Sequence, residues 1–329
     1  MRNIKKSITF SGGLGLFCTQ FVAEKRNLGY SYKTEEYLLK RFDQVSQKYD
    51  CNGLLTKELA LAWAKKRPNE SPKTHASRLT IVRQFGIFML RNGQEAYIIP
   101  ANSYSKKLSN HTPHIFTMKE LNTLFSKADN LKFDLHSPYR HLIIPLILRM
   151  LYGCGLRVSE ATHLRVCDVN LDNGVLTVLD TKSGKDRLVP MDISLIKRCR
   201  AYADRLHRIS KPDDFFFQTR DGEYFARQSV YTAFRQLLWK CGISYAGRAY
   251  GPRPHDLRHT QAVHCLKRWV KSGYDLSSAL PVLSTYLGHK TFEGTSRYLR
   301  LTAELYPDIT EAVEVKFGEL IPGGPYETN

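Results

Sequence analysis

Residues 254–260, PHDLRHT, contain two spacings that would serve different chemistries. His255 and His259 are four residues apart, the helical spacing at which two imidazoles bind one zinc ion. His255 and Arg258 are three residues apart, so on a helix they share a face on which they can hold a phosphate. Zinc is the weaker interpretation, because Asp256 replaces the glutamate of the H-E-x-x-H motif and no acidic third ligand is evident nearby. The pattern therefore favours a phosphate.

Three further stretches contain residue types that suit the same ligand. GLRVSEATHL places Arg157 at the expected start of a helix, with Glu160 one turn later. TKSGK places Lys182 at the tip of an expected hairpin, from which an ammonium can reach over a ligand. LGHKTFEGTSRYLRL contains His289 and, nine residues later, Tyr298. Each alone is better explained by a helix ion pair, a solvated lysine, a helix cap or a packed tyrosine, but their occurrence together favours one site.

Four stretches resemble the signature boxes of the tyrosine recombinase (phage integrase) family: GLRVSEATHLRVCDV, TKSGKDRLVP, HDLRHTQA and LGHKTFEGTSRY. The resemblance covers roughly residues 115–300, and all of the key positions are filled. It implies a site-specific DNA recombinase that cleaves and rejoins strands through a covalent 3′-phosphotyrosine intermediate. Integration or excision of a mobile element is the expected role, because LSSALPVLSTYLGH is similar to members carried by transposons. Xer-like dimer resolution is one alternative, and a DNA-binding factor without cleavage activity is another.

The chemistry of a DNA phosphodiester explains why these residue types are required. Two guanidiniums, Arg157 and Arg258, can neutralise the non-bridging oxygens and the charge added in a pentacovalent transition state. Tyr298 can attack phosphorus through its phenolic oxygen and form a covalent protein–DNA ester. Because phenolate is a fair leaving group, a strand hydroxyl can reverse the step and bond energy is conserved. No cofactor, metal or ATP is therefore expected.

The resemblance also implies roles for the other residues. Lys182 would donate a proton to the departing 5′ oxygen, and His255 would assist proton movement at the tyrosine and the phosphate. His289 would donate a hydrogen bond to the phosphate, and Glu160 would fix neighbouring side chains. His259 is expected to be only a helix neighbour that packs or bonds locally.

The charge of the chain agrees with double-stranded DNA as a partner. The chain has 329 residues, with 49 Lys and Arg against 31 Asp and Glu, which gives a net charge of +18. Such a surplus points to a polyanion, most often nucleic acid. It amounts to +9 in residues 1–105 (17 basic, 8 acidic) and +14 in residues 106–300 (31 basic, 17 acidic), whereas residues 301–329 carry −5 (1 basic, 6 acidic). DNA would repel this acidic tail, so we expect the tail to contact protein.

Cysteine usage and hydropathy indicate a cytoplasmic protein, and for a DNA-binding protein association with the nucleoid is expected. The seven cysteines are scattered without a C-x-x-C pair, which favours reduced thiols over disulfides or a zinc ribbon. The first 23 residues begin basic and continue uncharged, but polar and glycine residues break the apolar run, so a signal peptide is not expected. LIIPLILRMLYGCGL is interrupted by Pro145 and Arg149 and is too short to span a bilayer. It predicts a buried helix, and no membrane partner is expected.

Periodicity and cap residues predict two domains. Residues 1–105 are expected to form a helical core-DNA-binding domain, residues 106–114 a linker, residues 115–300 the catalytic domain, and residues 301–329 an acidic tail. The first domain is expected to contain helices over 34–49, capped by Thr34, over 55–67, and from Ser71-Pro72 to Asn92-Gly93. In the catalytic domain, Thr117 and Glu120 are placed as a capping box, and alternation over 174–191 predicts a hairpin. Further helices are expected at about 139–152, 193–208, 227–241, 255–272 and 276–287.

The expected fold is mainly α with a small β-sheet, in two domains that close on DNA as a C-shaped clamp. The resemblance implies a tetramer on two DNA sites, with accessory proteins as further partners. Leu305, Ile309, Val313 and Phe317 recur every four residues in the tail. By analogy with the family, this face is expected to pack on a neighbouring protomer, and a helix folded back on its own domain is the alternative. Target sequence and directionality stay open, because they depend on groove contacts and DNA deformability.

Overall fold

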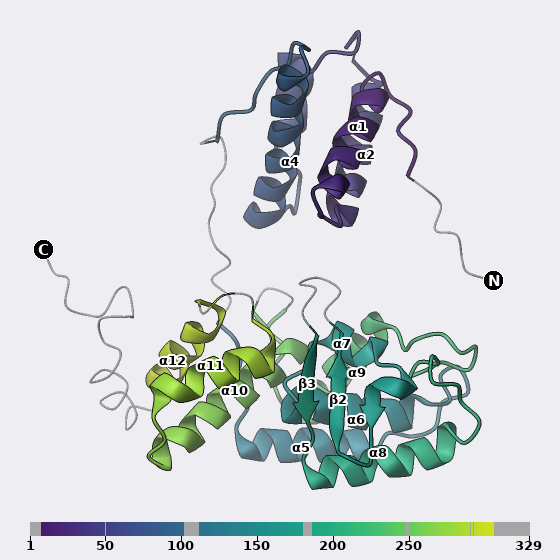
Figure 1. Cartoon of the computed structure of the whole chain (residues 1–329), viewed down its shortest axis with the longest axis vertical. Coiled ribbons are helices and arrows are strands. Elements are labelled where there is room, and N and C mark those ends of the chain that lie inside the picture. The colour runs from purple at the N-terminus through teal and green to yellow at the C-terminus, as the bar shows by residue number, and fades with distance from the viewer. Residues whose placement is uncertain are drawn as a thin grey trace, which may run out of the picture. The chain divides into compact units, whose positions relative to one another are not determined.

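The computed structural model describes residues 8–49, 51–101, 112–179, 186–247, 250–289, 291 and 293–305. The chain divides into two compact units, Met1–Asn110 and His111–Asn329 (Figure 1). Most of the expected linker at 106–114 lies outside the described residues, as do the tip of the expected hairpin with Lys182 and the tail beyond Leu305.

The described part of the first unit contains four helices: α1 (Gly15–Asn27), α2 (Lys33–Ser46), α3 (Lys57–Ala64) and α4 (Pro72–Arg91). Aromatic rings fill its core, where Phe42 meets Trp63 edge-on at 5.2 Å. The cap expected at the start of α4 is confirmed, because the Ser71 hydroxyl accepts a hydrogen bond from the Thr74 backbone N–H at 3.1 Å. The cap expected at Thr34 is wrong, because α2 already begins at Lys33. Helix α1 was not expected.

Helix α6 (Arg140–Gly153) is the core helix of the second unit. It packs against α5 (Met118–Asp129), α8 (Ile193–Leu206) and α10 (Pro254–Lys271). Its apolar residues from Ile143 to Leu148 are buried, so the long apolar run forms a core helix as predicted. None of the helices within the described ranges is long and apolar enough to cross a membrane.

The second unit also contains a small antiparallel sheet. Its strands β1 (Val169–Asn170), β2 (Val175–Val178) and β3 (Arg187–Pro190) pair in the order β1-β2-β3. Leu176 on β2 lies opposite Val189 on β3, and both side chains are fully buried. The two arms of the predicted hairpin are therefore confirmed, and the fold is mainly helical with a small sheet, as predicted.

Four more helices complete the described part of the second unit: α7 (Val158–His163), α9 (Arg227–Lys240), α11 (Leu276–Leu287) and α12 (Glu293–Leu305). The predicted capping box of α5 is present, with Thr117 and Glu120 bonding reciprocally. Helices α10, α11 and α12 contact one another and share an apolar cluster. Helix α12 was not expected as a helix, although it carries Tyr298.

Candidate active site

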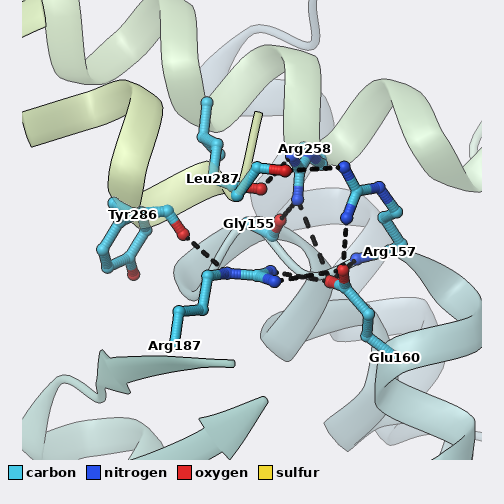
Figure 2. A network of polar contacts seen from close by, with 8 residues as sticks. Gly155, Arg157, Glu160, Arg187, Arg258, Tyr286 and Leu287 are labelled. Atoms are coloured by element: carbon cyan, nitrogen blue, oxygen red, sulfur yellow. Dashed lines mark hydrogen bonds and ion pairs between the residues drawn. The ribbon is translucent and has the colours of Figure 1, made fainter. Parts of the chain in front are cut away.

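Glu160 lies at the centre of a group of arginines that come from three elements (Figure 2). Arg157 immediately precedes α7; its backbone N–H donates to the Glu160 carboxylate at 2.8 Å, and its guanidinium donates to the same group at 2.5 Å. Arg187, the first residue of β3, donates to Oε1 at 3.2 Å and to Oε2 at 2.8 Å. Arg258 on α10 has Nη1 at 3.9 Å from Oε2. One carboxylate thus orients three guanidiniums.

The three guanidiniums differ in their access to solvent. The side chains of Arg258 and Arg187 are only 1% and 6% exposed, whereas that of Arg157 is 35% exposed. Arg157 also lines a cleft of about 760 Å³, together with Glu160 and Gly288. Two further arginines, Arg165 and Arg227, line the same cleft. A phosphate that enters this cleft would therefore meet Arg157 first, in a lining where three arginines outnumber the two carboxylates, Glu160 and Asp168.

The C-terminal end of α11 provides the other partners of these arginines. Three successive carbonyl groups each accept a hydrogen bond from a different guanidinium: Tyr286 from Arg187 at 2.9 Å, Leu287 from Arg258, and Gly288 from Arg157 at 3.0 Å. The last carbonyls of a helix lack partners within the helix and carry partial negative charge, so they attract cations.

A left-handed glycine makes this arrangement possible. Gly288 ends α11 with φ of 65°, a conformation that side-chain-bearing residues rarely adopt. A Cβ at this position would lie 2.8 Å from Nη1 of Arg187. Gly155, which also has a positive φ, offers its carbonyl to Nη1 of Arg258 at 2.5 Å. Gly288 thus lets the main chain approach the guanidinium of Arg187 closely.

Helix α10 presents the histidines of the PHDLRHT stretch. Pro254 occupies the first turn, where its missing N–H costs no hydrogen bond. The following residues then share one face of the helix, so that the rings of His255 and His259 meet edge to face at 4.6 Å. Within the described part of the chain, no three His, Cys, Asp or Glu side chains are grouped to hold a metal ion.

Tyr298 is buried against these histidines, with 2% of its surface exposed. Its hydroxyl is 2.9 Å from Nδ1 of His259, 39 residues earlier in the chain. The expectation that His259 bonds only locally is therefore wrong. The ring of His289 stacks on the ring of Tyr298, with the centroids 5.8 Å apart and the planes 20° apart. Nδ1 of His289 hydrogen-bonds to the Thr295 hydroxyl at 2.8 Å, which fixes the imidazole in this position.

Burial and positive charge make two of the imidazoles weak bases. Burial, followed by the charges of Arg258 and Arg157, lowers the pKa of His255 to about 4. The same causes, with Arg187 added, lower the pKa of His289 to about 4. Both rings are therefore neutral at pH 7 and able to accept or donate one hydrogen bond at each nitrogen.

The other titratable groups keep the charges that a phosphate site requires. Burial, and then the charge of Arg157, lowers the pKa of Arg258 to about 10, so its guanidinium is still protonated at pH 7. Burial raises the pKa of Tyr298, although the charge of Arg258 opposes the shift. Burial would also raise the pKa of Glu160, but hydrogen bonds from Arg187 and Arg157 outweigh it and lower that pKa. The site thus contains a neutral phenol beside fixed positive charge.

The structure brings six of the seven predicted site residues together: Arg157, Glu160, His255, Arg258, His289 and Tyr298. The seventh, Lys182, lies outside the described residues. Arg187 was missed. The alternation that predicts the hairpin places it on the same face of the strand as the buried Val189, and a charged residue on an inward face is the signal that could have indicated it.

Comparisons with known proteins identify the family of this chain. Residues 115–304 match the sequence model of the phage integrase family. A Sinorhizobium fredii protein named as an integrase/recombinase is 30% identical over 305 residues, which cover 90% of this chain and 95% of that protein. The tyrosine recombinase XerA of Pyrococcus furiosus is 34% identical over 171 residues, or 51% of this chain and 53% of XerA.

One solved structure shows the same fold at low sequence identity. It is the XerH site-specific recombinase bound to a palindromic difH substrate, with a TM-score of 0.61 and 17% identity. The match covers 86% of this chain and 78% of that chain.

Proposed function

This chain belongs to the phage integrase family, whose members are tyrosine recombinases that cleave and rejoin DNA, and we propose that it recombines DNA at specific sites to integrate or excise a mobile element. In this proposal Tyr298 is the nucleophile and forms the covalent 3′-phosphotyrosine intermediate. One observation carries it. The Tyr298 hydroxyl lies against His259 on α10, the helix that also carries Arg258.

Arg157 and Arg258 are proposed to bind the scissile phosphate. Glu160 holds Arg157 at 2.5 Å and has Arg258 at 3.9 Å, so both guanidiniums are oriented before DNA arrives. Such fixed cations stabilise the added charge of a pentacovalent transition state without reorganising during the reaction. Glu160 is accordingly proposed as the residue that positions them.

The remaining roles follow from chemistry and from the family. His289 and His255 are neutral imidazoles beside the arginines, which suits hydrogen bonding to the phosphate. Lys182 is proposed to protonate the departing 5′ oxygen, as the family resemblance implies. No metal ion, nucleotide or other cofactor takes part in the proposed reaction, because the tyrosine ester conserves the energy of the broken bond.

The mobile-element role is supported by the Sinorhizobium fredii relative, which is named as an integrase/recombinase and matches almost from end to end. Dimer resolution is the second candidate, supported by the 34% identity to XerA over about half of the chain. Both candidates use the same cleavage chemistry and differ in the DNA sites that are joined.

Double-stranded DNA is the proposed partner, and XerH, which has the same fold, is a recombinase bound to DNA. The net charge of +18 makes phosphate contacts the main source of affinity, so binding should weaken steeply as salt is raised. We further propose a C-shaped clamp, a tetramer on two sites, and a tail that packs on a neighbouring protomer.

The proposal is tested by covalent trapping. The protein is incubated with fragmented DNA of its source organism in EDTA, quenched in SDS, and any DNA that remains attached is recovered and sequenced. Tyr298→Phe is run in parallel, and Tyr274→Phe, at a tyrosine that is 65% exposed, is the matched control. Attachment by the wild type and Tyr274→Phe, but not by Tyr298→Phe, is expected.

The recovered sequences separate the two biological roles. Ends of a mobile element would support integration or excision, whereas a single chromosomal or plasmid site would support dimer resolution. Tight binding without attachment by any variant would overturn the proposed reaction and leave a DNA-binding factor.

A further inference from the structure

Tyr298 and His259 form a direct contact in which His259 has so far been given no chemical role. The Tyr298 hydroxyl oxygen is 2.9 Å from Nδ1 of His259, within hydrogen-bonding distance of the atom that must lose its proton. Their ring centroids are 5.5 Å apart, and the ring planes are tilted by 52°. The two side chains come from different helices, α10 and α12, which pack against each other.

We propose that His259 is the base that accepts the proton of Tyr298 when the tyrosine attacks DNA. This inference rests on the proposed role of Tyr298 as nucleophile. The O–H bond of Tyr298 breaks, and its proton passes to the lone pair on Nδ1 of His259. The phenolic oxygen forms a bond to phosphorus as the bond from phosphorus to the 5′ oxygen breaks, and the 5′ oxygen leaves with a proton from Lys182.

A protein base is needed because Tyr298 is almost completely buried. With 2% of its surface exposed, the side chain has little access to water that could remove the proton. Burial also raises the pKa of this phenol, so it is protonated at neutral pH. A neutral hydroxyl is a weak nucleophile, and an imidazole already in contact with it shortens the proton transfer to one step.

The other two histidines, His289 and His255, make different contacts from that of His259. His289 contacts the face of the Tyr298 ring, and its Nδ1 is already paired with the Thr295 hydroxyl at 2.8 Å. The ring of His255 meets that of His259 edge to face, with the centroids 4.6 Å apart. Burial, and then the charges of Arg258 and Arg157, lower the pKa of His255 to about 4, which makes it a weak base. The family resemblance implies that His255 assists proton movement at the tyrosine and the phosphate; at the tyrosine, the contact of 2.9 Å favours His259.

His264 offers a matched control on the same helix. Its Nδ1 contacts the hydroxyl of Tyr152 at 3.1 Å, a pair of the same kind as His259 with Tyr298. It is also partly buried, and neither residue belongs to the proposed active site. A substitution at His264 therefore removes a comparable histidine–tyrosine contact from α10 without touching the nucleophile.

The test compares variants that keep or remove two separate properties of His259. His259→Asn can still hydrogen-bond to the phenol but cannot accept its proton at neutral pH, whereas His259→Leu can do neither. The probe is a synthetic nicked duplex that carries the site recovered by covalent trapping. The rate of covalent attachment is measured for both variants, for His264→Asn and for the wild type, and melting temperatures confirm that each variant is folded.

We expect both His259 variants to attach about 100-fold or more slowly than the wild type, because general base help is worth roughly 10²–10⁴-fold. His264→Asn should attach at the wild-type rate. If His259→Leu fails to fold, His259→Asn decides alone. Attachment by His259→Asn within about threefold of the wild-type rate would overturn the inference, because a hydrogen bond without proton transfer would then suffice.

A second duplex separates the base from the acid. Sulfur replaces the 5′ bridging oxygen at the scissile phosphate, and because a thiolate leaves without a proton, this substrate should restore the rate of Lys182→Ala. It should not restore His259→Asn, whose defect is at the attacking atom. Restoration of His259→Asn would overturn the inference. Failure of the wild type to attach to any DNA in the covalent-trapping experiment would instead overturn the proposed function itself.

Discussion

Glu160→Gln tests whether one buried carboxylate holds the three arginines in place. The substitution keeps the shape of the side chain and removes its negative charge. Each carboxylate oxygen accepts one hydrogen bond from Arg157 and one from Arg187, at 2.5 to 3.2 Å. In glutamine one of these oxygens is replaced by an NH₂ group, which is a donor and would face only the N–H donors of the two arginines. Arg258, with its Nη1 at 3.9 Å from Oε2, would also lose its nearest counter-charge.

The expected loss of stability is large because the group is buried. The Glu160 side chain is only 8% exposed, and removing one partner of a buried ion pair costs about 3–5 kcal/mol. For a domain of this size, such a loss lowers the melting temperature by roughly 6–20 °C. Asp129→Asn is the control, because Asp129 also pairs with two arginines, Arg149 at 2.7 Å and Arg198 at 3.4 Å, but is 35% exposed. It should cost less than about 1 kcal/mol.

Thermal unfolding followed by circular dichroism, from pH 8 to pH 3, measures both effects. The folded-state pKa of Glu160 is lowered, so its contribution is fully present above the unfolded value of about 4.3 and is lost as the pH falls through the folded value. The difference between the wild type and Glu160→Gln should therefore be constant from pH 8 to about pH 5 and shrink below about pH 4. An equal loss in Glu160→Gln and Asp129→Asn would refute the reasoning.

Two further predictions concern the backbone and the histidines. Gly288→Ala should lower the free energy of unfolding, measured in urea, by about 1–3 kcal/mol, because it strains a residue with φ of 65° and places Cβ 2.8 Å from Arg187. Gly273→Ala is the control: its φ is 73°, but the space around it is open, so it should cost less. An equal cost would show that the close approach to Arg187 does not contribute. Burial and nearby arginines lower the pKa of His289 to about 4 in the folded state, whereas its unfolded value is about 6.5. Below about pH 6.5 the imidazole is therefore protonated in the unfolded chain before it is protonated in the folded chain, and the folded state loses stability. His289→Asn should therefore lose less stability than the wild type between pH 7 and pH 5, and parallel losses in thermal unfolding would contradict this.

The sequence reveals most of the site because phosphate chemistry restricts residue types at short spacings. Arg157 and Glu160 are three residues apart, and His255 and Arg258 also three, so each pair can be placed on a helix face before the fold is known. The hairpin arms and the core helix α6 were predictable for a similar reason, since alternation and apolar runs are local patterns.

Contacts between distant positions could not be derived from local spacing. The pairing of Arg187 with Glu160 joins positions 27 residues apart, and that of His259 with Tyr298 joins positions 39 apart. Helix α12 was missed for two reasons. Gly294 lies in its first turn and weakens helix propensity, and its apolar residues span too few turns for their helical spacing to stand out. Its helical form depends on packing against α10 and α11, which only the folded unit provides.

The three arginine-bound carbonyls at the end of α11 have a consequence for mutational studies. They belong to residues 286–288, and the chain continues from there into α12, which carries Tyr298. Removing any one of these guanidiniums therefore alters the positive charge of the site and the path of the main chain toward the tyrosine at the same time. The free-energy effects of substitutions at Arg157, Arg187 and Arg258 should accordingly be non-additive, and a double-mutant cycle is required to separate the binding of charge from the placement of the nucleophile.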